Sequence, residues 1–511
     1  MKTGRPLSEE DLAELRAAGI GEQKILEQMD LFRSGPRYAR LERACTVGDG
    51  IVALSERQCR EAAARFDREA ADGRFLKFVP ASGAATRMFK SWFQAIEKGG
   101  FSSPDEGRRF LTDLKRFAFW DDLADSISRA GGSLTGWLDA GRAADIIEMI
   151  LTNRGLDYGC LPKALLKFHA YPDGARTPLE EHLVEAALYV RDREGLCRIA
   201  YTVAEEHQGV VAAHLAGAIP RYEKKFDVRF AWQISAQKAS TRTIAVDLDN
   251  RPFRDRDGRL LLRPAGHGAL LENLNAIEGE FVFIKNIDNV VPDRLKPETV
   301  RYKKVLGGVL AALREEVFRH LAVLESPGVE EPFLAEAVRF CGEKLNISFP
   351  AGFPTLPASG RGVFLRRCLD RPLRVCGMVR NEGEPGGGPF WVRGEDGLSS
   401  LQIVEEFQVE EGSPGQREIW RQATHFNPVD LVCSVRDRRG RKYDLRDFVD
   451  PRAVCITRKS EKGRELKALE LPGLWNGSMS RWNTVFIDLP IETFNPVKTI
   501  GDLLRPQHQP E

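Results

Sequence analysis

A run of small side chains precedes an arginine early in the chain. It follows the apolar, strand-like segment 75–79, leads into Arg87, and consists of Ser82, Gly83, Ala84, Ala85 and Thr86. Small side chains let backbone N–H groups approach a ligand closely, and the start of a helix adds partial positive charge. Arg87 can donate two parallel hydrogen bonds to phosphate oxygens. The loop predicts a site for a nucleotide's phosphates, although such a turn is about as often purely structural.

An aspartate closes a second apolar segment. Residues 280–287 read as a strand, and Asp288 and Asn289 follow it. In open α/β folds, ligands bind beyond the carboxyl ends of the strands, so this carboxylate stands where a ligand would lie. Taken without other motifs, an aspartate that caps the next turn is the simpler interpretation.

The elements that must position these side chains alternate along the chain. The apolar pattern predicts helices over 8–71, 89–152, 205–226 and 301–325, and strands over 75–79, 197–203, 228–235, 243–247 and 280–287. Residues 349–362 read as a loop, and the last third reads as strands. This order favours an α/β fold in which helices flank a mixed, mainly parallel sheet.

Composition narrows the possible classes of protein. The 511 residues are 42% hydrophobic and 29% charged, as in soluble globular proteins, and no apolar run is long enough to cross a bilayer. With 75 basic and 74 acidic side chains, the chain lacks the overall charge of a nucleic-acid-binding protein. Nine scattered cysteines indicate reduced thiols rather than disulfides or a zinc site. No export signal begins the sequence, so we expect a cytoplasmic protein without membrane or nucleic-acid partners.

Several segments occur in the order found in UDP-sugar pyrophosphorylases. The small-residue loop ends in Thr-Arg-Met at 86–88, Pro-Lys-Ala-Leu-Leu follows at 162–166, and Pro-Leu-Glu-Glu-His begins a helix at 178–182. A glutamine-bearing strand then precedes Pro-Ala-Gly-His-Gly at 264–268. The chain thus resembles the nucleotide-diphospho-sugar transferase (GT-A) superfamily, as a bacterial group distantly related to these pyrophosphorylases. The resemblance implies a GT-A-like, Rossmann-like fold.

The most specific match lies near the end of the sequence. Residues 494–504 resemble the Phe-x-Pro-Val-Lys-Thr-x-x-Asp-Leu-Leu segment of UDP-glucose pyrophosphorylases. Arg87 and Lys163 are further apart than in most members, and a helical insertion over about 89–158 would explain this spacing. We therefore expect a helical N-terminal region (1–71), a first part of the core (72–300), a second helical insertion (301–350) and a last part (351–511) that completes the core.

The resemblance implies a role for each motif. The catalytic residues that contact the reacting phosphates would be Arg87, Lys163 and Lys498, and Asp288 would hold Mg²⁺. Residues that bind the nucleotide would be Ser82, Gly83, Ala84, Ala85, Thr86, Gln237, Gly266, His267 and Gly268. Weaker matches assign the sugar to Asn381, Glu382, Gly383, Glu405 and His425. A lone lysine, histidine or glutamate of this kind is more often an ordinary surface or structural residue.

The predicted function is the Mg²⁺-dependent formation of a nucleotide sugar and pyrophosphate from a nucleoside triphosphate and a sugar 1-phosphate. The resemblance favours UTP as the nucleotide. Two alternatives remain open: a metal-dependent glycosyltransferase of the same fold, and a non-catalytic protein that binds nucleotide sugars. The sequence lacks the Gly-Lys pair of a P-loop, the Gly-x-Ser-x-Gly turn of hydrolases and the His-Glu-x-x-His motif of metalloproteases.

Overall fold

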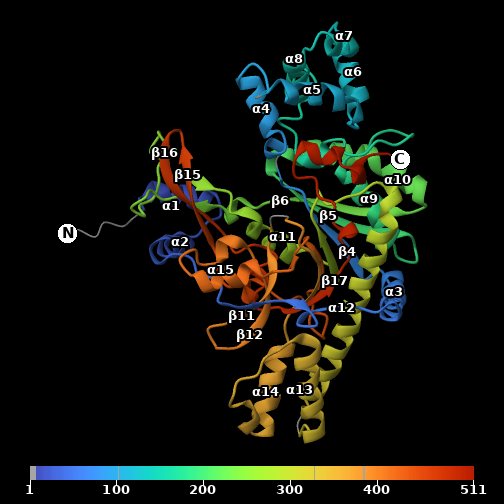
Figure 1. Ribbon diagram of the computed structural model, residues 1–511. Helices are drawn as coiled ribbons and strands as arrows, with labels where there is room; N and C mark the ends of the chain where they lie inside the picture. The colour runs from blue at the N-terminus through green and yellow to red at the C-terminus, as the bar shows by residue number, and fades with distance from the viewer. Residues whose placement is uncertain (1–6, 84, 102, 327, 384–385, 511) are drawn as a thin grey trace, which may run out of the picture. The chain divides into compact units, whose positions relative to one another are not determined.

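The computed structural model describes residues 7–83, 85–101, 103–326, 328–383 and 386–510. It has a mixed α/β fold in which helices flank a largely parallel sheet, and this confirms the predicted fold class (Figure 1). Two compact units make up the chain, each assembled from three stretches. The first unit comprises Met1–Phe66, Gln237–Phe283 and Val305–Pro490, and the second comprises Asp67–Ala236, Ile284–Lys304 and Ile491–Glu511.

Parallel strands form the framework of the second unit. Strand β5 (Leu196–Val203) pairs in parallel with both β4 (Phe75–Pro80) and β6 (Arg229–Ala236). Helix α9 (Pro178–Tyr189) packs against β5 and against α10 (Gln208–Phe226). All six residues of β4 are buried, because the strand lies inside the sheet. The strand therefore delivers the small-residue loop that follows it to a fixed place.

The start of α9 is fixed by its own sequence. Thr177 accepts a hydrogen bond from the Glu180 amide at 3.3 Å, and the Glu180 carboxylate accepts one from the Thr177 amide at 2.7 Å. Pro178 occupies the first turn, where no N–H is needed. This capping box explains why the Pro-Leu-Glu-Glu-His segment begins a helix and holds its register.

Five α-helices lie in the described part of residues 89–158, where we predict a helical insertion. They are α4 (Lys90–Glu97), α5 (Pro104–Asp113), α6 (Trp120–Arg129), α7 (Leu134–Asp139) and α8 (Ala143–Leu151) (Figure 1). Their aromatic core includes Trp92 and Phe110, whose rings meet edge to face at 5.1 Å. Val497, Ile500 and Leu503 belong to the same core. The segment that carries Lys498 is therefore anchored by apolar packing on both sides of the lysine.

Strands of the first unit pair both in parallel and in antiparallel orientation. Strand β17 (Asn483–Asp488) pairs in parallel with β10 (Leu373–Arg380) and with β3 (Gly50–Val52). Antiparallel partners of β10 are β14 (Asp430–Ser434) and the short β13 (His425–Phe426). A separate sheet has the order β1 (Leu41–Ala44), β11 (Gly388–Arg393) and β12 (Ser399–Val404). The prediction that strands dominate the last third is confirmed.

Shorter elements complete the described part of the chain. They are β2 (Thr46–Val47), β7 (Thr243–Ile244), β8 (Leu262–Arg263), α11 (Leu270–Ala276), β9 (Phe281–Lys285), α15 (Pro414–Arg421), β15 (Cys455–Glu461) and β16 (Arg464–Glu470). Two long helices, α12 (Lys296–Leu324) and α13 (Glu331–Leu345), account for most of residues 301–350, the range of the second predicted helical insertion. Within the described ranges, none of the helices is long and apolar enough to cross a membrane.

Two local predictions are wrong. Residues 8–71 contain helices α1 (Glu9–Ala17), α2 (Glu22–Ser34) and α3 (Glu56–Ala71), but 41–52 forms β1 to β3 instead of a helix. These strands are too short for their pattern to be recognised, and they gain their hydrogen bonds from the distant β11 and β17. The expected loop over 349–362 ends at Pro357, where α14 (Ala358–Leu369) begins. Burial of Leu365 and Leu369 outweighs the low helix propensity of its two glycines.

Candidate functional site

Two lysines converge on one aspartate in the second unit. The Asp288 carboxylate accepts a hydrogen bond from Lys163 Nζ at 3.0 Å and lies 3.1 and 3.3 Å from Lys498 Nζ. Asp288 is 7% exposed and Lys163 is equally well buried, whereas half of the Lys498 side chain is exposed. Three of the predicted site residues thus form one cluster, and Lys498 is the member with freedom to move.

Backbone hydrogen bonds join the segments that carry this cluster. Lys163 donates from its side chain to the Val497 carbonyl at 2.8 Å, and its amide donates to the Gly83 carbonyl at 3.3 Å. The Val497 amide donates to the Asp288 carbonyl at 3.0 Å. After Lys498, the Asp502 carboxylate accepts from the Lys498 amide at 2.8 Å and closes a turn. The small-residue loop, the Pro-Lys segment and the Val-Lys segment therefore meet beside Asp288.

Arg87 lies in the same unit, one turn beyond the small-residue loop. It ends the single turn Ala85–Arg87, its side chain is exposed, and among the described residues it has no ion pair. The next carbonyl, of Met88, accepts from the Ile500 amide at 3.3 Å, so the loop contacts the Lys498 segment. The guanidinium is free to bind an anion.

The loop itself is open at its centre. Gly83 and Thr86 are exposed, Ser82 is half-buried and Ala85 is buried, while Ala84 lies outside the described residues. A Cβ atom added to Gly83 would meet nothing within 4 Å, so its backbone is accessible. This exposure is compatible with the predicted approach of phosphate groups to the loop amides.

The charge of the cluster favours an anion. Burial alone would raise the pKa of Asp288, but the ammonium groups of Lys498 and Lys163 outweigh it and lower that pKa. The carboxylate is therefore ionised at neutral pH, and with two ammonium groups the cluster carries a net positive charge. A polyphosphate would be attracted to it.

Asp288 is the carboxylate that the cluster offers to Mg²⁺. The described residues hold no group of three or more His, Cys, Asp or Glu side chains that could bind a metal. Mg²⁺ is nevertheless often bound by one or two carboxylates together with substrate phosphates. Asp288 alone fits a cation of this kind that arrives with a triphosphate.

A buried triad of charged side chains joins α9 to strands β4 and β9. The sequence did not predict it. Glu185 on α9 accepts from Lys77 at 2.6 Å and from Lys285 at 2.7 Å, and all three side chains are at most 1% exposed. The two lysines outweigh burial and hold the pKa of Glu185 well below its usual range. Burial lowers the pKa of Lys77 to about 7, although Glu185 opposes this shift. The triad fixes α9 to the segments that precede the loop and Asp288.

Its sequence signal is a charged residue inside an apolar strand. Lys77 interrupts the apolar segment 75–79, and Lys285 follows four apolar residues in 281–284. A lysine at such a place requires a buried carboxylate partner. Nothing in the local pattern identifies Glu185 as that partner.

Two stacked histidines form another buried cluster in the second unit. His169 Nε2 lies 2.9 Å from His508 Nδ1, and His169 Nδ1 lies 2.9 Å from the Glu181 carboxylate. Burial and the neighbouring His169 lower the pKa of His508 to about 3. Burial also lowers the pKa of His169, against the opposing effect of Glu181. Both imidazoles are therefore neutral in the folded protein at neutral pH.

We expect acid to destabilise the protein well before its carboxylates titrate. The unfolded chain binds protons at these histidines near pH 6.5, whereas folded His508 binds one only near pH 3. The contribution of His508 to stability is thus complete above pH 6.5 and is lost as the pH drops toward 3, by about 1.4 kcal/mol per pH unit. Melting temperatures between pH 7 and 4 measure this loss. His508→Asn should reduce the slope, and an unchanged slope would contradict the assignment to His508.

Predicted binding residues of the first unit form two groups. In one, His267 stacks on Trp475 with ring centroids 4.0 Å apart, and its Nε2 lies 3.5 Å from Glu405. Asn476 donates to the same carboxylate at 3.1 Å. A predicted nucleotide residue and a predicted sugar residue are therefore neighbours. Gln237, which directly follows β6, is half-buried.

The glycines beside His267 allow another segment of the chain to approach closely. A Cβ on Gly268 would lie 2.3 Å from the Pro472 carbonyl oxygen, and one on Gly266 would lie 2.4 Å from the Glu470 carboxylate. Gly266 also has a positive φ of 69°. The observed close approach is thus with residues 470–472, which a larger side chain would displace.

The other group surrounds His425. Its Nε2 lies 3.3 Å from the Asp488 carboxylate, and burial lowers its pKa although Asp488 opposes this. Next to it, the Asn381 amide donates to the Thr424 carbonyl at 3.0 Å. Asn381, Glu382 and Gly383 form an exposed turn in which the Asn381 side chain accepts from the Gly383 amide at 2.9 Å.

Several solved structures are similar to this chain at low identity. UDP-glucose pyrophosphorylase from Leishmania major, solved in open and closed forms, shares 14% identity with a TM-score of 0.45, covering 98% of this chain and 79% of that chain. UDP-glucose phosphorylase from Trypanosoma brucei shares 12% with a TM-score of 0.44, covering 97% and 77%. Uridine diphosphate N-acetylglucosamine pyrophosphorylase from Trypanosoma brucei, in complex with an inhibitor, shares 12% with a TM-score of 0.40, covering 98% and 79%.

A family model also matches this chain. No match was found among curated proteins. The family model for DUF4301, described as a domain of unknown function, matches residues 8–509 and so spans almost the whole chain. This protein therefore belongs to the DUF4301 family.

Proposed function

We propose that this protein is a nucleotidyltransferase, which forms a nucleotide sugar and pyrophosphate from a nucleoside triphosphate and a sugar 1-phosphate. The observation that carries the proposal is the convergence of Lys163 and Lys498 on Asp288, beside the loop that precedes Arg87. Each of these residues belongs to a motif that resembles the UDP-sugar pyrophosphorylases. A net positive cluster beside an open, small-residue loop suits a triphosphate.

The reaction requires no covalent enzyme intermediate. A phosphate oxygen of the sugar 1-phosphate attacks the α-phosphorus of the nucleoside triphosphate, while the bond from that phosphorus to the oxygen bridging to the β-phosphate breaks. Pyrophosphate leaves with the electron pair of that bond. The task of the protein is to align the two substrates and to offset the charge of the attacking and leaving oxygens.

The side chains divide this task according to their burial. Exposed Arg87 binds phosphate oxygens with its fork of donors, and half-exposed Lys498 moves from Asp288 to the reacting phosphates. Lys163, buried against Asp288 and the Val497 carbonyl, adds fixed positive charge. Mg²⁺, held by Asp288 together with phosphate oxygens, would polarise the phosphoryl group and neutralise charge.

The motifs also assign residues to the base and to the sugar. We assign the nucleotide to Gln237 and the His267 segment, and the sugar to Glu405, His425 and the exposed turn at 381–383. UTP is the favoured nucleotide, because the matching motifs resemble enzymes that act on UDP-sugars. These assignments follow the motifs quoted above.

The test is an assay of pyrophosphate release with the full chain and Mg²⁺. Each of the four common nucleoside triphosphates is combined with a panel of sugar 1-phosphates. We expect release only when both substrates are present, with UTP the most active nucleotide. Turnover of a nucleotide sugar with an acceptor would instead show a glycosyltransferase. A rise in melting temperature with ligand, but without product, would indicate a binding protein.

A further inference from the structure

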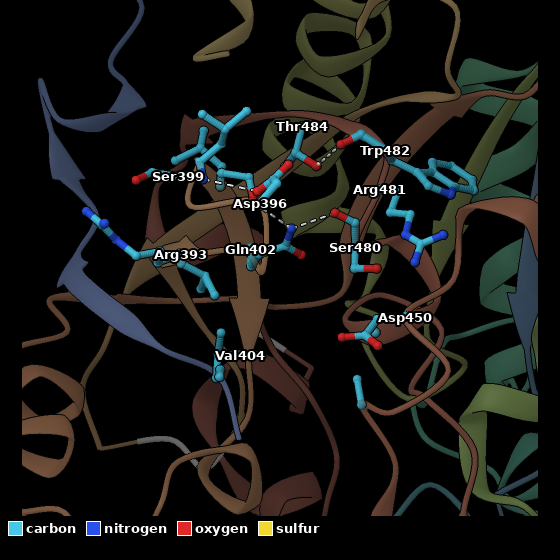
Figure 2. Close-up of a pocket in the computed structure, with 18 of the residues that line it drawn as sticks. Arg393, Asp396, Ser399, Gln402, Val404, Asp450, Ser480, Arg481, Trp482 and Thr484 are labelled. Atoms are coloured by element: carbon cyan, nitrogen blue, oxygen red, sulfur yellow. Dashed lines mark hydrogen bonds between the residues drawn. The ribbon is translucent and has the colours of Figure 1, made fainter. Parts of the chain in front are cut away.

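A cavity lies within the first unit (Figure 2). Its volume is about 710 Å³, within the range of small-molecule sites. Separate segments line it, among them 37–40, 367–371, 392–404, 450–453 and 476–484. Of the described residues assigned above to the nucleotide, the sugar or the metal, none lines this cavity. We name it the arginine cavity, because seven arginines line it: Arg37, Arg40, Arg367, Arg371, Arg393, Arg452 and Arg481.

The arginine cavity has a local excess of positive charge. Its three acidic residues are Glu395, Asp396 and Asp450, so the seven arginines leave a formal charge of 7 − 3 = +4. The whole chain carries only +1. Charge of one sign inside a concavity concentrates counter-ions there. The cavity is therefore suited to a ligand with several negative charges.

Ion pairs account for only two of these arginines. Arg37 contacts Glu395 at 2.6 Å and Asp450 at 3.4 Å, and thereby occupies two of the three acidic residues. Arg393 contacts Glu42, which is outside the cavity, at 2.6 Å. Within the described ranges, the remaining arginines have no carboxylate partner: Arg40, Arg367, Arg371, Arg452 and Arg481. Five guanidinium groups are thus without an ion pair, although Arg371 Nε donates to the Arg367 carbonyl at 3.0 Å.

Hydrogen bonds connect the segments that line the cavity. Gln402 donates to the Ser480 carbonyl at 2.6 Å, and Figure 2 shows Arg393 and Arg481 on opposite sides of Gln402. Arginines from separate segments therefore border the same cavity.

We infer that the arginine cavity binds a phosphorylated small molecule, at a site separate in its residues from the Asp288 cluster. Arginine forks match phosphate oxygens in geometry, and each can form two parallel hydrogen bonds. The few carboxylates of the cavity argue against a cation. Arg37 pairs with Glu395 and Asp450, so within the described ranges Asp396 is the one acidic lining residue without an ion pair. A ligand with two or more phosphate charges uses the five free guanidinium groups best.

The inference is tested by titration calorimetry with inorganic pyrophosphate in the absence of divalent cations. All variants are built on Lys498→Ala, so that binding at the Asp288 cluster is weakened and the remaining heat comes from the arginine cavity. We expect measurable binding in this background and at least a tenfold loss of affinity when Arg371→Ala and Arg481→Ala are added. Unchanged affinity in that variant overturns the proposal.

Two further variants keep the result specific. Arg421→Ala removes an exposed arginine of the same unit that does not line the cavity, and it should leave the affinity within twofold. An equal loss in Arg421→Ala would show that only overall charge matters and would also overturn the proposal. Arg481→Ala alone removes one exposed guanidinium group of the cavity, and it should weaken binding severalfold with little change in melting temperature. It remains informative if the double arginine variant fails to fold.

Discussion

Replacing Lys498 by alanine should lower kcat for pyrophosphate release by about 100- to 1,000-fold, the usual effect of losing one charge-stabilising group. The half-exposed lysine is the cluster member best able to follow the charge that develops on the phosphates. Asp288→Asn should cause a loss of similar size, because the amide would hold both the lysines and a cation less well. Steady-state kinetics with UTP and the preferred sugar 1-phosphate measure both effects.

The matched control is Lys225→Ala. Lys225 is an exposed lysine of the same unit that also pairs with one carboxylate, Asp173, at 3.2 Å. Its removal should leave kcat within about twofold, as expected for a surface ion pair. Full turnover by Lys498→Ala or by Asp288→Asn would refute the proposed roles. A folded variant is verified by an unchanged melting temperature.

Replacing Glu185 by glutamine should destabilise the protein by about 3–5 kcal/mol, the usual cost of removing one partner from a buried ion pair. Lys77 and Lys285 would be left at most 1% exposed without a counter-charge. Their ammonium groups would have to lose protons or draw water into the core. Denaturant unfolding at pH 7 measures the change.

Two comparisons isolate the buried charge as the cause. Glu206→Gln changes an exposed glutamate of the same unit and should shift stability by less than about 0.5 kcal/mol. The triple variant Glu185→Leu, Lys77→Met and Lys285→Met removes all three charges and should recover most of the loss. If Glu185→Gln lost less than about 1 kcal/mol, the triad would not be the support described here.

The elements with strong local signals were predictable. Strand 75–79, the helix that starts at Thr177 and the helices of the insertion each have a local cause, such as a capping box or a regular apolar pattern. The short strands in 41–52 have no such cause, because their partners β11 and β17 lie far away in sequence. Tertiary packing likewise decided that α14 begins at Ala358.

The candidate site, too, was predictable only in part. Residue types and motif order indicated Lys163, Asp288 and Lys498, although the two lysines lie 125 and 210 positions from the aspartate. The pairing of Glu185 with both Lys77 and Lys285 could not be predicted, since several glutamates of α9 were equally plausible partners. Contacts between distant segments depend on the packing of the whole fold. A single sequence shows that a buried charge needs a partner, but not which residue supplies it.

The segment that carries Lys498 also completes the apolar core of the helical insertion. Val497, Ile500 and Leu503 pack among side chains from residues 85–168, so this early segment lacks part of its interior until residues 497–503 have been synthesised. Chains fold from the N-terminus as the ribosome releases them. Completion of this core and the contact of Lys498 with Asp288 therefore depend on the same segment, and a chain without residues 497–503 would lack both.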